Sequence, residues 1–487
     1  MKKDSLKNNF VFQIAYQVLM LFIPLIVAPY LTRVLGSNNL GAYAYVHSVA
    51  YYFVLFAMLG ISKYGQRLIA QSSNDAILLR KSFWSLFATH TLVSLLAIAF
   101  YSFFVFFIVD NNENFYWADF FYVVSALFDI TWLFYGLENF RSVVYRNTIV
   151  KVLECALIFI LVQSIDDTVL YILICSVSIL LGQLAMIPIA LKNIPPIKVT
   201  FPEVIKHVKP LLILSIAVLA VSLYTIFGKT LLGIFAEDAY VAFYEYADRL
   251  VKIPLTFIIV VGTVMLPRAC NLAYFKKDQE QSKYYEYSIW FVTIISSLTF
   301  WIMLVLSEDL VVAYLGDEFL YCGKVVVWLS PVILIIGLGD IVRNQYLIPN
   351  HRDKLYTIGV CCNAVINIII SITLLYFLSG PYKILGVVIG TISAELFGTF
   401  FQYFVCRDLV SASNVIKPLI VTTIIGIITF LSLYLIKQLL PNGLMYLIVE
   451  LLFGFAVYVV FFYIYTSKFN QDLKNIILSF VKIKNRK

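Results

Sequence analysis

The chain has 487 residues, of which 61% are hydrophobic and only 13% are charged, and its mean hydropathy is +0.90. A soluble domain carries about 25% charged residues, so this composition excludes an ordinary soluble protein and indicates an integral membrane protein. The net charge of +8 lies in short loops between apolar runs. That placement is typical of membrane topology and argues against nucleic-acid binding.

Apolar runs recur from one end of the chain to the other, and each is long enough to cross a hydrocarbon core of about 30 Å. The first follows a basic segment, as in a signal peptide, but it has no small-x-small cleavage site and contains Pro24 and Pro29. We therefore interpret it as the first membrane helix. The sequence predicts an all-α protein with about fourteen transmembrane spans, at 10–32, 39–61, 83–108, 117–137, 145–165, 169–191, 210–233, 241–267, 286–306, 323–343, 356–378, 384–405, 416–436 and 444–466.

Lysine and arginine gather in alternate loops of this topology. The loops on the side of the termini are basic, beginning with Lys2, Lys3 and Lys7 and ending with a basic tail from Lys468. The opposite loops are acidic or neutral: 110–114, 165–167, 236–238, 307–309 and 316–318. Because basic residues of short loops stay in the cytoplasm, the pattern predicts that both termini are cytoplasmic.

The longest cytoplasmic connection, residues 192–209, is rich in proline and lysine and predicts a linker between two lobes. The predicted lobes are 1–191 and 210–405, followed by two additional helices and the tail in 406–487. A weak internal repeat supports this division.

The repeat consists of residues 32–46 and 228–247. Each segment has a basic residue, then leucine and glycine, a short polar crossing and a tyrosine-rich helix start. Parallel repeats in a transporter predict two six-helix lobes with substrate between them. Chance similarity of apolar segments is the alternative.

Four charges share one stripe of the eighth span. Glu245, Asp248, Arg249 and Lys252 lie at i, i+3, i+4 and i+7. A charge inside the membrane is costly and needs a partner, a hydrated cavity or a function. The stripe is either an internally neutralised structural seam or the wall of a cavity in which an anionic substrate displaces the acids from the two cations. We favour the cavity.

Arg33 and Lys229 occupy matching places in the two repeat segments, near the outer ends of the first and seventh spans. Long basic side chains at helix ends often reach toward the headgroups. Both nevertheless lie on the side where positive charge is scarce, which favours a role in anion binding. Both interpretations stay open.

Several other polar residues lie inside predicted spans. Asp340 and Arg343 are three residues apart and are expected to satisfy each other. Asp129 and Glu395 have no obvious local partner, so each is either structural or a proton or cation site of a coupled transporter. His47 is equally compatible with packing and with function.

Sequence signals for an enzyme are missing. Gly228, Lys229 and Thr230 resemble the end of a phosphate-binding loop, but position 223 is leucine where the motif needs glycine. No loop exceeds about 20 residues, which leaves no room for a soluble catalytic domain. The seven cysteines include no C-x-x-C pair, so neither a disulfide framework nor a zinc site is predicted, and no cofactor or metal is expected.

Three segments carry a resemblance to a known family. The opening PLIVAPYLTRVLGSNNLGAYAYV (24–46), then GISKYGQRLIA (60–70) and YEYADRLVKIPLTFI (244–258), are similar to the O-antigen and polysaccharide flippases of the Wzx type. That family lies in the superfamily of multidrug exporters and the lipid II flippase.

The resemblance implies a two-lobed bacterial inner-membrane transporter that carries undecaprenyl-pyrophosphate-linked oligosaccharide to the outer leaflet by alternating access. It implies that Arg33, Arg249 and Lys252, with Lys229 from the internal repeat, bind the pyrophosphate. Glu245, Asp248, Asp129, Glu395, Asp340 and Arg343 are the supporting or coupling candidates. The implied partners are an H⁺ or Na⁺ counter-ion, membrane lipids, a polysaccharide polymerase and a chain-length regulator.

Three other functions remain to be weighed. A multidrug exporter of the same fold favours an acidic or aromatic cavity, and the Arg249 and Lys252 pair argues for an anionic lipid instead. A lipid II flippase differs in the sugar that it carries. A glycosyltransferase or O-antigen polymerase needs a sizeable periplasmic loop, and the predicted topology has none.

Overall fold

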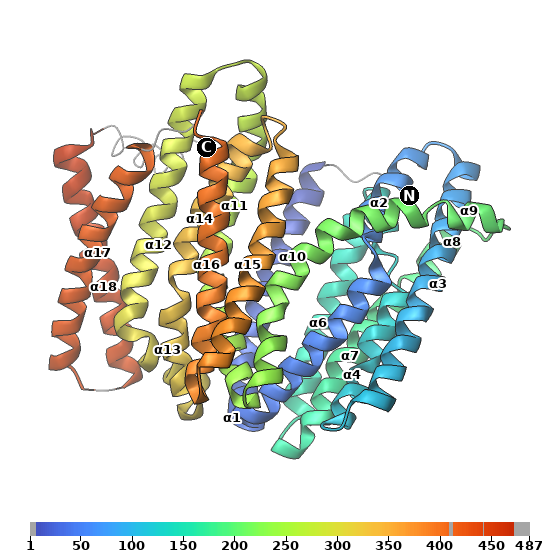
Figure 1. The fold of residues 1–487 in the computed structure, drawn as a ribbon, viewed down its shortest axis with the longest axis horizontal. Helices are drawn as coiled ribbons and strands as arrows, with labels where there is room; N and C mark the ends of the chain where they lie inside the picture. Colours follow the sequence, from blue (N-terminus) through green and yellow to red (C-terminus); the bar gives the residue numbers. More distant parts are fainter. Residues whose placement is uncertain (1–5, 409–412, 442, 472–487) are drawn as a thin grey trace. The chain divides into compact units, whose positions relative to one another are not determined.

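The structure is a computed structural model that describes residues 6–408, 413–441 and 443–471. Within these ranges the regular elements are all helices, which confirms the predicted all-α membrane fold (Figure 1). Lys2, Lys3 and most of the predicted basic tail lie outside the described residues.

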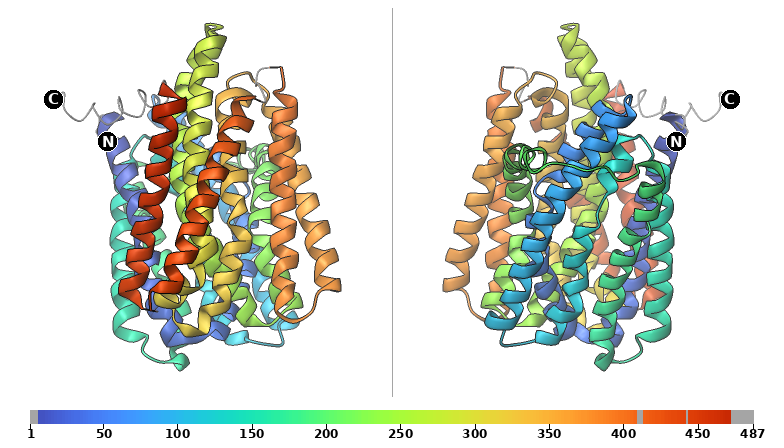
Figure 2. Two further views of the ribbon diagram at one scale, coloured as in Figure 1. Left: turned by 90° about the vertical axis from the view of Figure 1, so that its left-hand side faces the viewer. Right: turned by 90° about the vertical axis from the view of Figure 1, so that its right-hand side faces the viewer.

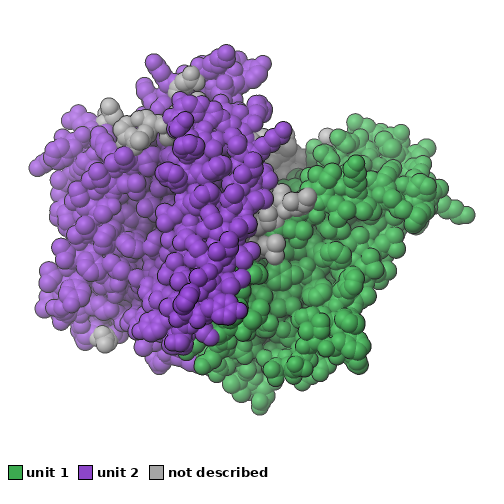
Figure 3. Space-filling view, viewed as in Figure 1, with its two compact units in different colours: residues 1–242 green, residues 243–487 purple. Residues whose placement is uncertain are grey.

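The chain folds as two compact units, residues 1–242 and 243–487 (Figure 3). The boundary falls within α11, whereas the predicted linker 192–209 lies inside the first unit. The division into the lobes 1–191 and 210–405 therefore stays a prediction. The helices of the first unit are α1 (Leu6–Met58), α2 (Ile61–Ser72), α3 (Ala76–Ile108), α4 (Glu113–Leu127), α5 (Thr131–Gly136), α6 (Phe140–Leu161), α7 (Thr168–Leu184), α8 (Ile187–Asn193), α9 (Phe201–Ile205) and α10 (Val208–Phe235).

The second unit consists mainly of long apolar helices, several of which pack against α12. Its elements are α11 (Asp238–Tyr274), α12 (Asp278–Leu315), α13 (Leu320–Leu329), α14 (Pro331–Val342), a π-helical turn (Arg343–Leu347), α15 (Asp353–Phe377), α16 (Lys383–Val405), α17 (Ser413–Leu439) and α18 (Leu444–Phe469). The ends of α11 and α12 project past their neighbours (Figure 2). Leu306 of α12, Leu433 of α17 and Leu447 of α18 form a buried cluster where these three helices meet.

Eleven stretches of the described residues are long and apolar enough to cross a membrane. One of them, Phe22–Ser72, contains the second predicted span and part of the first, while the predicted spans 145–165 and 210–233 correspond to α6 and α10. The predicted span 323–343 covers parts of α13 and α14, two shorter helices that meet at Ser330. The predicted spans therefore all coincide with helices.

The predicted break between the first two spans lies at Gly36. Its backbone, at φ 73° and ψ 172°, interrupts α1 and turns the chain back. A positive φ of this kind suits glycine, which has no Cβ to clash with its own backbone. Gly36 thus supplies the turn between the two arms of α1.

The segment 194–207 is held against the first unit by polar contacts. Arg80 donates to the carbonyl oxygens of Pro195 and Pro196, each at 3.0 Å. Lys81 pairs with Glu203, and this ammonium group lowers the pKa of the Glu203 carboxyl to about 2. Much of the predicted linker 192–209 is thus fixed to its neighbours by polar contacts.

His207 lies at the end of this segment, directly before α10. Its ring is 1% exposed, with Nδ1 2.8 Å from the Tyr64 hydroxyl and Nε2 2.9 Å from Ser85 Oγ. Burial, followed by the charge of Lys206, lowers the pKa of His207 to about 4. The neutral ring is therefore the form that stabilises the fold.

We expect the His207 contribution to appear in the pH dependence of unfolding. Because the folded pKa lies below the ordinary value of about 6.5, the stabilisation is complete above that value and is lost as pH falls towards 4. The His207→Gln variant should therefore unfold at a less pH-dependent temperature between pH 6.5 and 4 than the parent, measured in detergent micelles. His351→Gln, which changes an exposed histidine, is the control; equal pH slopes for parent and His207→Gln would contradict the assignment.

Candidate functional site

Both ion pairs predicted for the charged stripe form on α11. Arg249 Nε lies 2.6 Å from Glu245 Oε1, and Lys252 Nζ lies 2.6 Å from Asp248 Oδ2. The two cationic side chains are about half exposed, at 50% and 51%, while the two acids are 10% and 17% exposed. The acids are thus much more buried than the cations. The exposed ends of Arg249 and Lys252 are accessible to an anion.

An aromatic ring supports Arg249 from the same helix. Its guanidinium carbon is 5.3 Å from the centre of the Tyr246 ring, a cation–π distance. Tyr246 is itself buried, with its ring 5.3 Å from that of Phe319. Because the ring is fixed by packing, it restricts the directions in which Arg249 can point.

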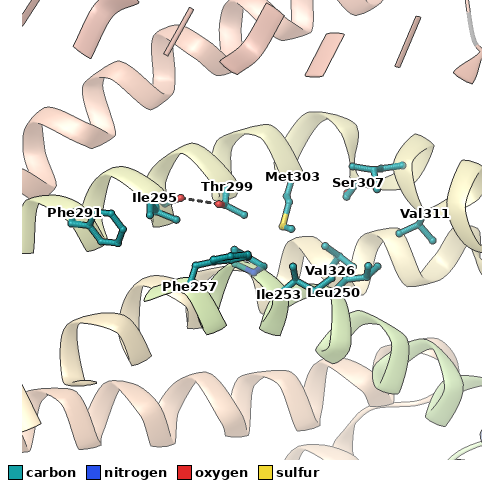
Figure 4. A pocket seen from close by; sticks show the side chains of 12 residues that line it. Leu250, Ile253, Phe257, Phe291, Ile295, Thr299, Met303, Ser307, Val311 and Val326 are labelled. Atoms are coloured by element: carbon teal, nitrogen blue, oxygen red, sulfur yellow. Dashed lines mark hydrogen bonds between the residues drawn. The ribbon is translucent and has the colours of Figure 1, made fainter. Parts of the chain in front are cut away.

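A second stripe of α11 is apolar and lines a cavity of about 520 Å³. Leu250, Ile253, Pro254 and Phe257 repeat at i, i+3, i+4 and i+7, and in Figure 4 the labelled residues among them face α12. The cavity is completed by Phe291, Ile295, Thr299, Met303, Ser307, Leu310 and Val311 of α12 and by Val326 of α13.

One polar group in the lining is satisfied by a hydrogen bond within α12. The Thr299 hydroxyl donates to the carbonyl oxygen of Ile295 at 2.8 Å (Figure 4). The cavity contains no charged side chain, so it suits hydrocarbon and not a phosphate. Charged and apolar stripes therefore occupy different faces of α11.

The other two predicted cations belong to the first unit. Arg33 is exposed on α1 and donates through Nη1 to the carbonyl oxygen of Pro29 at 2.8 Å. Lys229 is half-buried on α10. Their role in anion binding stays a prediction.

The two repeat segments pack on each other within the first unit. Just after the first segment, Ser48 Oγ and the Tyr52 hydroxyl of α1 lie 3.0 Å and 2.9 Å from Thr230 Oγ1 of α10. A Cβ on Gly41 would lie 1.7 Å from the carbonyl oxygen of Asp238, and one on Gly233 would lie 2.1 Å from the ring of Tyr45. Glycine at both positions thus allows α1 to approach α10 and the start of α11 closely.

The structure corrects the prediction that Asp129 has no local partner. Its Oδ1 accepts hydrogen bonds from the backbone N–H of Thr131 at 2.9 Å and from the Thr131 hydroxyl at 2.6 Å. It lies in a break of the predicted span 117–137, between α4 and α5. A carboxylate at this place satisfies a backbone N–H group that a helix start leaves without an intrahelical acceptor.

Glu395 is 8% exposed on α16, so it lies inside the second unit. Asp340 and Arg343 form the predicted ion pair, and Asp340 also accepts from Asn344 Nδ2 at 2.9 Å. The same carboxylate presses against α11, since a Cβ on Gly262 would lie 2.0 Å from Asp340 Oδ2. This group joins α11 to α14 and the π-helical turn.

Sequence reasoning missed the partner of His47. Its Nδ1 is 3.0 Å from Oδ2 of Asp119, a carboxylate on α4 that is completely buried. The residues are 72 positions apart, and no local spacing relates them. The one signal available was an acidic residue within an apolar span.

Comparison with known proteins places the chain in a family. A model of the family described as "Polysaccharide biosynthesis protein" matches residues 6–273. A Shigella dysenteriae protein named "Putative O-antigen transporter" is 25% identical over 384 residues, covering 78% of this chain and 94% of that protein. An Escherichia coli (strain K12) protein of the same name is 20% identical and covers 83% and 98%.

Solved structures of transporters share the fold. The lipid II flippase MurJ in its inward closed conformation has a TM-score of 0.75 at 17% identity, covering 94% of this chain and 98% of that one. An inward-facing multidrug resistance MATE family transporter of the MOP superfamily has a TM-score of 0.61 at 14% identity, covering 81% and 95%. At these identities the likeness concerns the fold alone.

Proposed function

We propose, from the premise that this chain belongs to the family of polysaccharide biosynthesis proteins, that it is a flippase for an undecaprenyl-pyrophosphate-linked oligosaccharide. It moves a repeat unit of O-antigen or another surface polysaccharide from the cytoplasmic to the outer leaflet by alternating access. The similarity to two O-antigen transporters over 78% and 83% of this chain carries the proposal. It is a membrane transporter and not an enzyme.

The charges on α11 support an anionic headgroup. Arg249 and Lys252 are the outward members of their ion pairs, and a pyrophosphate offers each of them stronger hydrogen bonds than a single carboxylate oxygen. When the lipid binds, the phosphate replaces the carboxylate as the partner of each cation. Arg249 and Lys252 therefore never face hydrocarbon without an anion. Arg33 and Lys229 are candidates for further contacts with the headgroup.

The apolar stripe of the same helix suits the lipid's hydrocarbon chain. A pyrophosphate with sugars cannot cross hydrocarbon unaided, whereas its isoprenoid tail need never leave it. The cavity between α11, α12 and α13 is lined almost entirely by apolar side chains. We propose that α11 binds the headgroup on its charged stripe and a part of the tail on its apolar stripe.

The remaining features of the proposal concern the cell. The protein lies in the bacterial inner membrane with both termini in the cytoplasm, works with a polysaccharide polymerase and a chain-length regulator, and exchanges its substrate against H⁺ or Na⁺. The charge asymmetry of the loops supports the orientation, and the family supports the location and the partners.

Deleting the gene in the source bacterium is expected to abolish surface polysaccharide, with completed lipid-linked units accumulating on the cytoplasmic side. Surface polymer and undecaprenyl-linked intermediates are the measurements, and the plasmid-borne gene should restore the polymer. Normal display with heightened drug sensitivity would contradict the proposal in favour of a multidrug exporter. Accumulation of lipid II with normal surface polymer would contradict it in favour of a cell-wall flippase.

A further inference from the structure

Asp119 is the most completely enclosed acid of the first unit. It belongs to the membrane-spanning stretch Glu113–Gly136, and its exposed fraction is 0%. One of its oxygens, Oδ1, has no hydrogen-bond partner among the described residues. A carboxylate in such a place must carry a proton or face a compensating cation.

His47 is the group that compensates it. The imidazole Nδ1 lies 3.0 Å from Asp119 Oδ2, while 36% of the His47 side chain is exposed compared with 1% for that of Asp119. The imidazole therefore links a sealed carboxylate to the protein surface.

Among the described residues, no contact places a second cation on Asp119 beside His47; aromatic rings pack around the imidazole instead. The rings of Tyr43 and Tyr122 lie against His47, with centroids 5.4 Å and 4.6 Å away. The titratable groups around the pair are Tyr43 and Tyr51 of α1, Tyr101 of α3, Tyr122 of α4, Tyr171 and Cys175 of α7, the ion pair Lys151 and Glu154 of α6, and Asp129 after α4.

Lys151, the cation in that set, is already held by Glu154, with Nζ 2.7 Å from Oε1. The protonation state of His47 therefore decides the net charge at Asp119. With imidazolium the pair is neutral. A ring without the Nε2 proton could still donate Nδ1–H to the carboxylate, and the pair would then carry one negative charge.

We propose that the His47 and Asp119 pair is the site at which this transporter binds and releases the proton that it exchanges against its lipid-linked substrate. This inference rests on the proposed function and specifies its counter-ion. It also moves the coupling role away from Asp129, whose Oδ1 is engaged by Thr131 at the start of α5. The negative charge left by deprotonation is sealed from lipid and is relieved only when the proton returns.

An assay with reconstituted protein can distinguish a proton-coupling role of the His47 and Asp119 pair from a purely structural one. Purified chain in liposomes is given undecaprenyl pyrophosphate carrying a fluorescent group as the probe, and flipping is followed by chemical quenching with and without a proton gradient. The parent should flip the probe faster with the gradient and should release protons to a pH-indicator dye when the probe is added. His47→Gln and Asp119→Asn keep hydrogen-bonding groups at these positions but cannot form the ion pair, so both should flip the probe at a rate that the gradient does not change and should release no protons.

Asp129→Asn is the matched control, since it alters a neighbouring acid outside the pair, and it should retain the response to the gradient. The proposal is overturned if His47→Gln and Asp119→Asn respond to the gradient as the parent does. It is also overturned if the parent flips the probe without any response to protons, or responds to a sodium gradient instead. Both of these outcomes leave the flippase function intact, whereas absence of probe flipping by the folded parent would contradict the proposed function itself.

Discussion

Replacing Arg249 and Lys252 together with glutamine is expected to abolish surface polysaccharide while the protein still reaches the membrane. Each cation is proposed to make a charge-assisted hydrogen bond to pyrophosphate, and such bonds contribute about 1.5–3 kcal/mol. Losing two of them costs about 3 kcal/mol or more, which corresponds to roughly a 100-fold loss of affinity. Polymer display in the deletion strain and quantified membrane insertion are the two measurements.

The double variant leaves Glu245 and Asp248 without their cations, so it can also fail by misfolding. A fully neutral variant, E245Q/D248N/R249Q/K252Q, removes that difficulty because no buried charge remains. If the stripe binds substrate, this variant inserts normally and does not transport. If it transports normally, the stripe is a structural seam. Lys277→Gln, which alters an exposed lysine paired with Glu280, is the control and should have no effect.

Joining α1 to α10 by a disulfide is expected to stop transport reversibly. Ser48 Oγ and Thr230 Oγ1 are 3.0 Å apart, close enough for cysteines at these positions to approach disulfide geometry with small side-chain shifts. Ser48 lies in the predicted lobe 1–191 and Thr230 in the predicted lobe 210–405. If these lobes move against each other during alternating access, this contact must open in every cycle.

The S48C/T230C pair is introduced into a chain whose seven natural cysteines are replaced by serine. Oxidant should halt probe flipping in liposomes, and a reductant should restore it. The control is S72C/S82C, because Ser72 Oγ and Ser82 Oγ are 2.9 Å apart and both belong to the predicted lobe 1–191. Undiminished flipping by fully cross-linked S48C/T230C would show that α1 and α10 stay together during transport.

The membrane helices could be predicted because hydrocarbon imposes length and apolarity on every span. The break between the first two spans could likewise be predicted, because a polar crossing separates two apolar runs there, and the structure places it at Gly36. The charged stripe followed from helical spacing, because its ion pairs are four residues apart. Such features can be predicted because each depends on residues that are close together in the sequence.

Contacts between distant segments could not be predicted in this way. The packing of Ser48 on Thr230 joins residues 182 positions apart, and the pairing of His47 with Asp119 depends on how α1 meets α4. The break at Asp129 was hidden because the residues on both sides of it are apolar. A hydropathy pattern indicates that a segment is in the membrane but not which neighbour satisfies its polar groups.

Glu245 and Asp248 neutralise the charged stripe when no lipid is bound. Because each cation already has a carboxylate on its own helix, the charged stripe is electrically neutral before any lipid arrives. A flippase of the proposed kind could then return to its cytoplasm-facing state without cargo and without carrying an uncompensated charge of this stripe through hydrocarbon. Under the proposed function, net export would then need no return load of anionic lipid, as expected of a one-way carrier and not of an obligatory lipid exchanger.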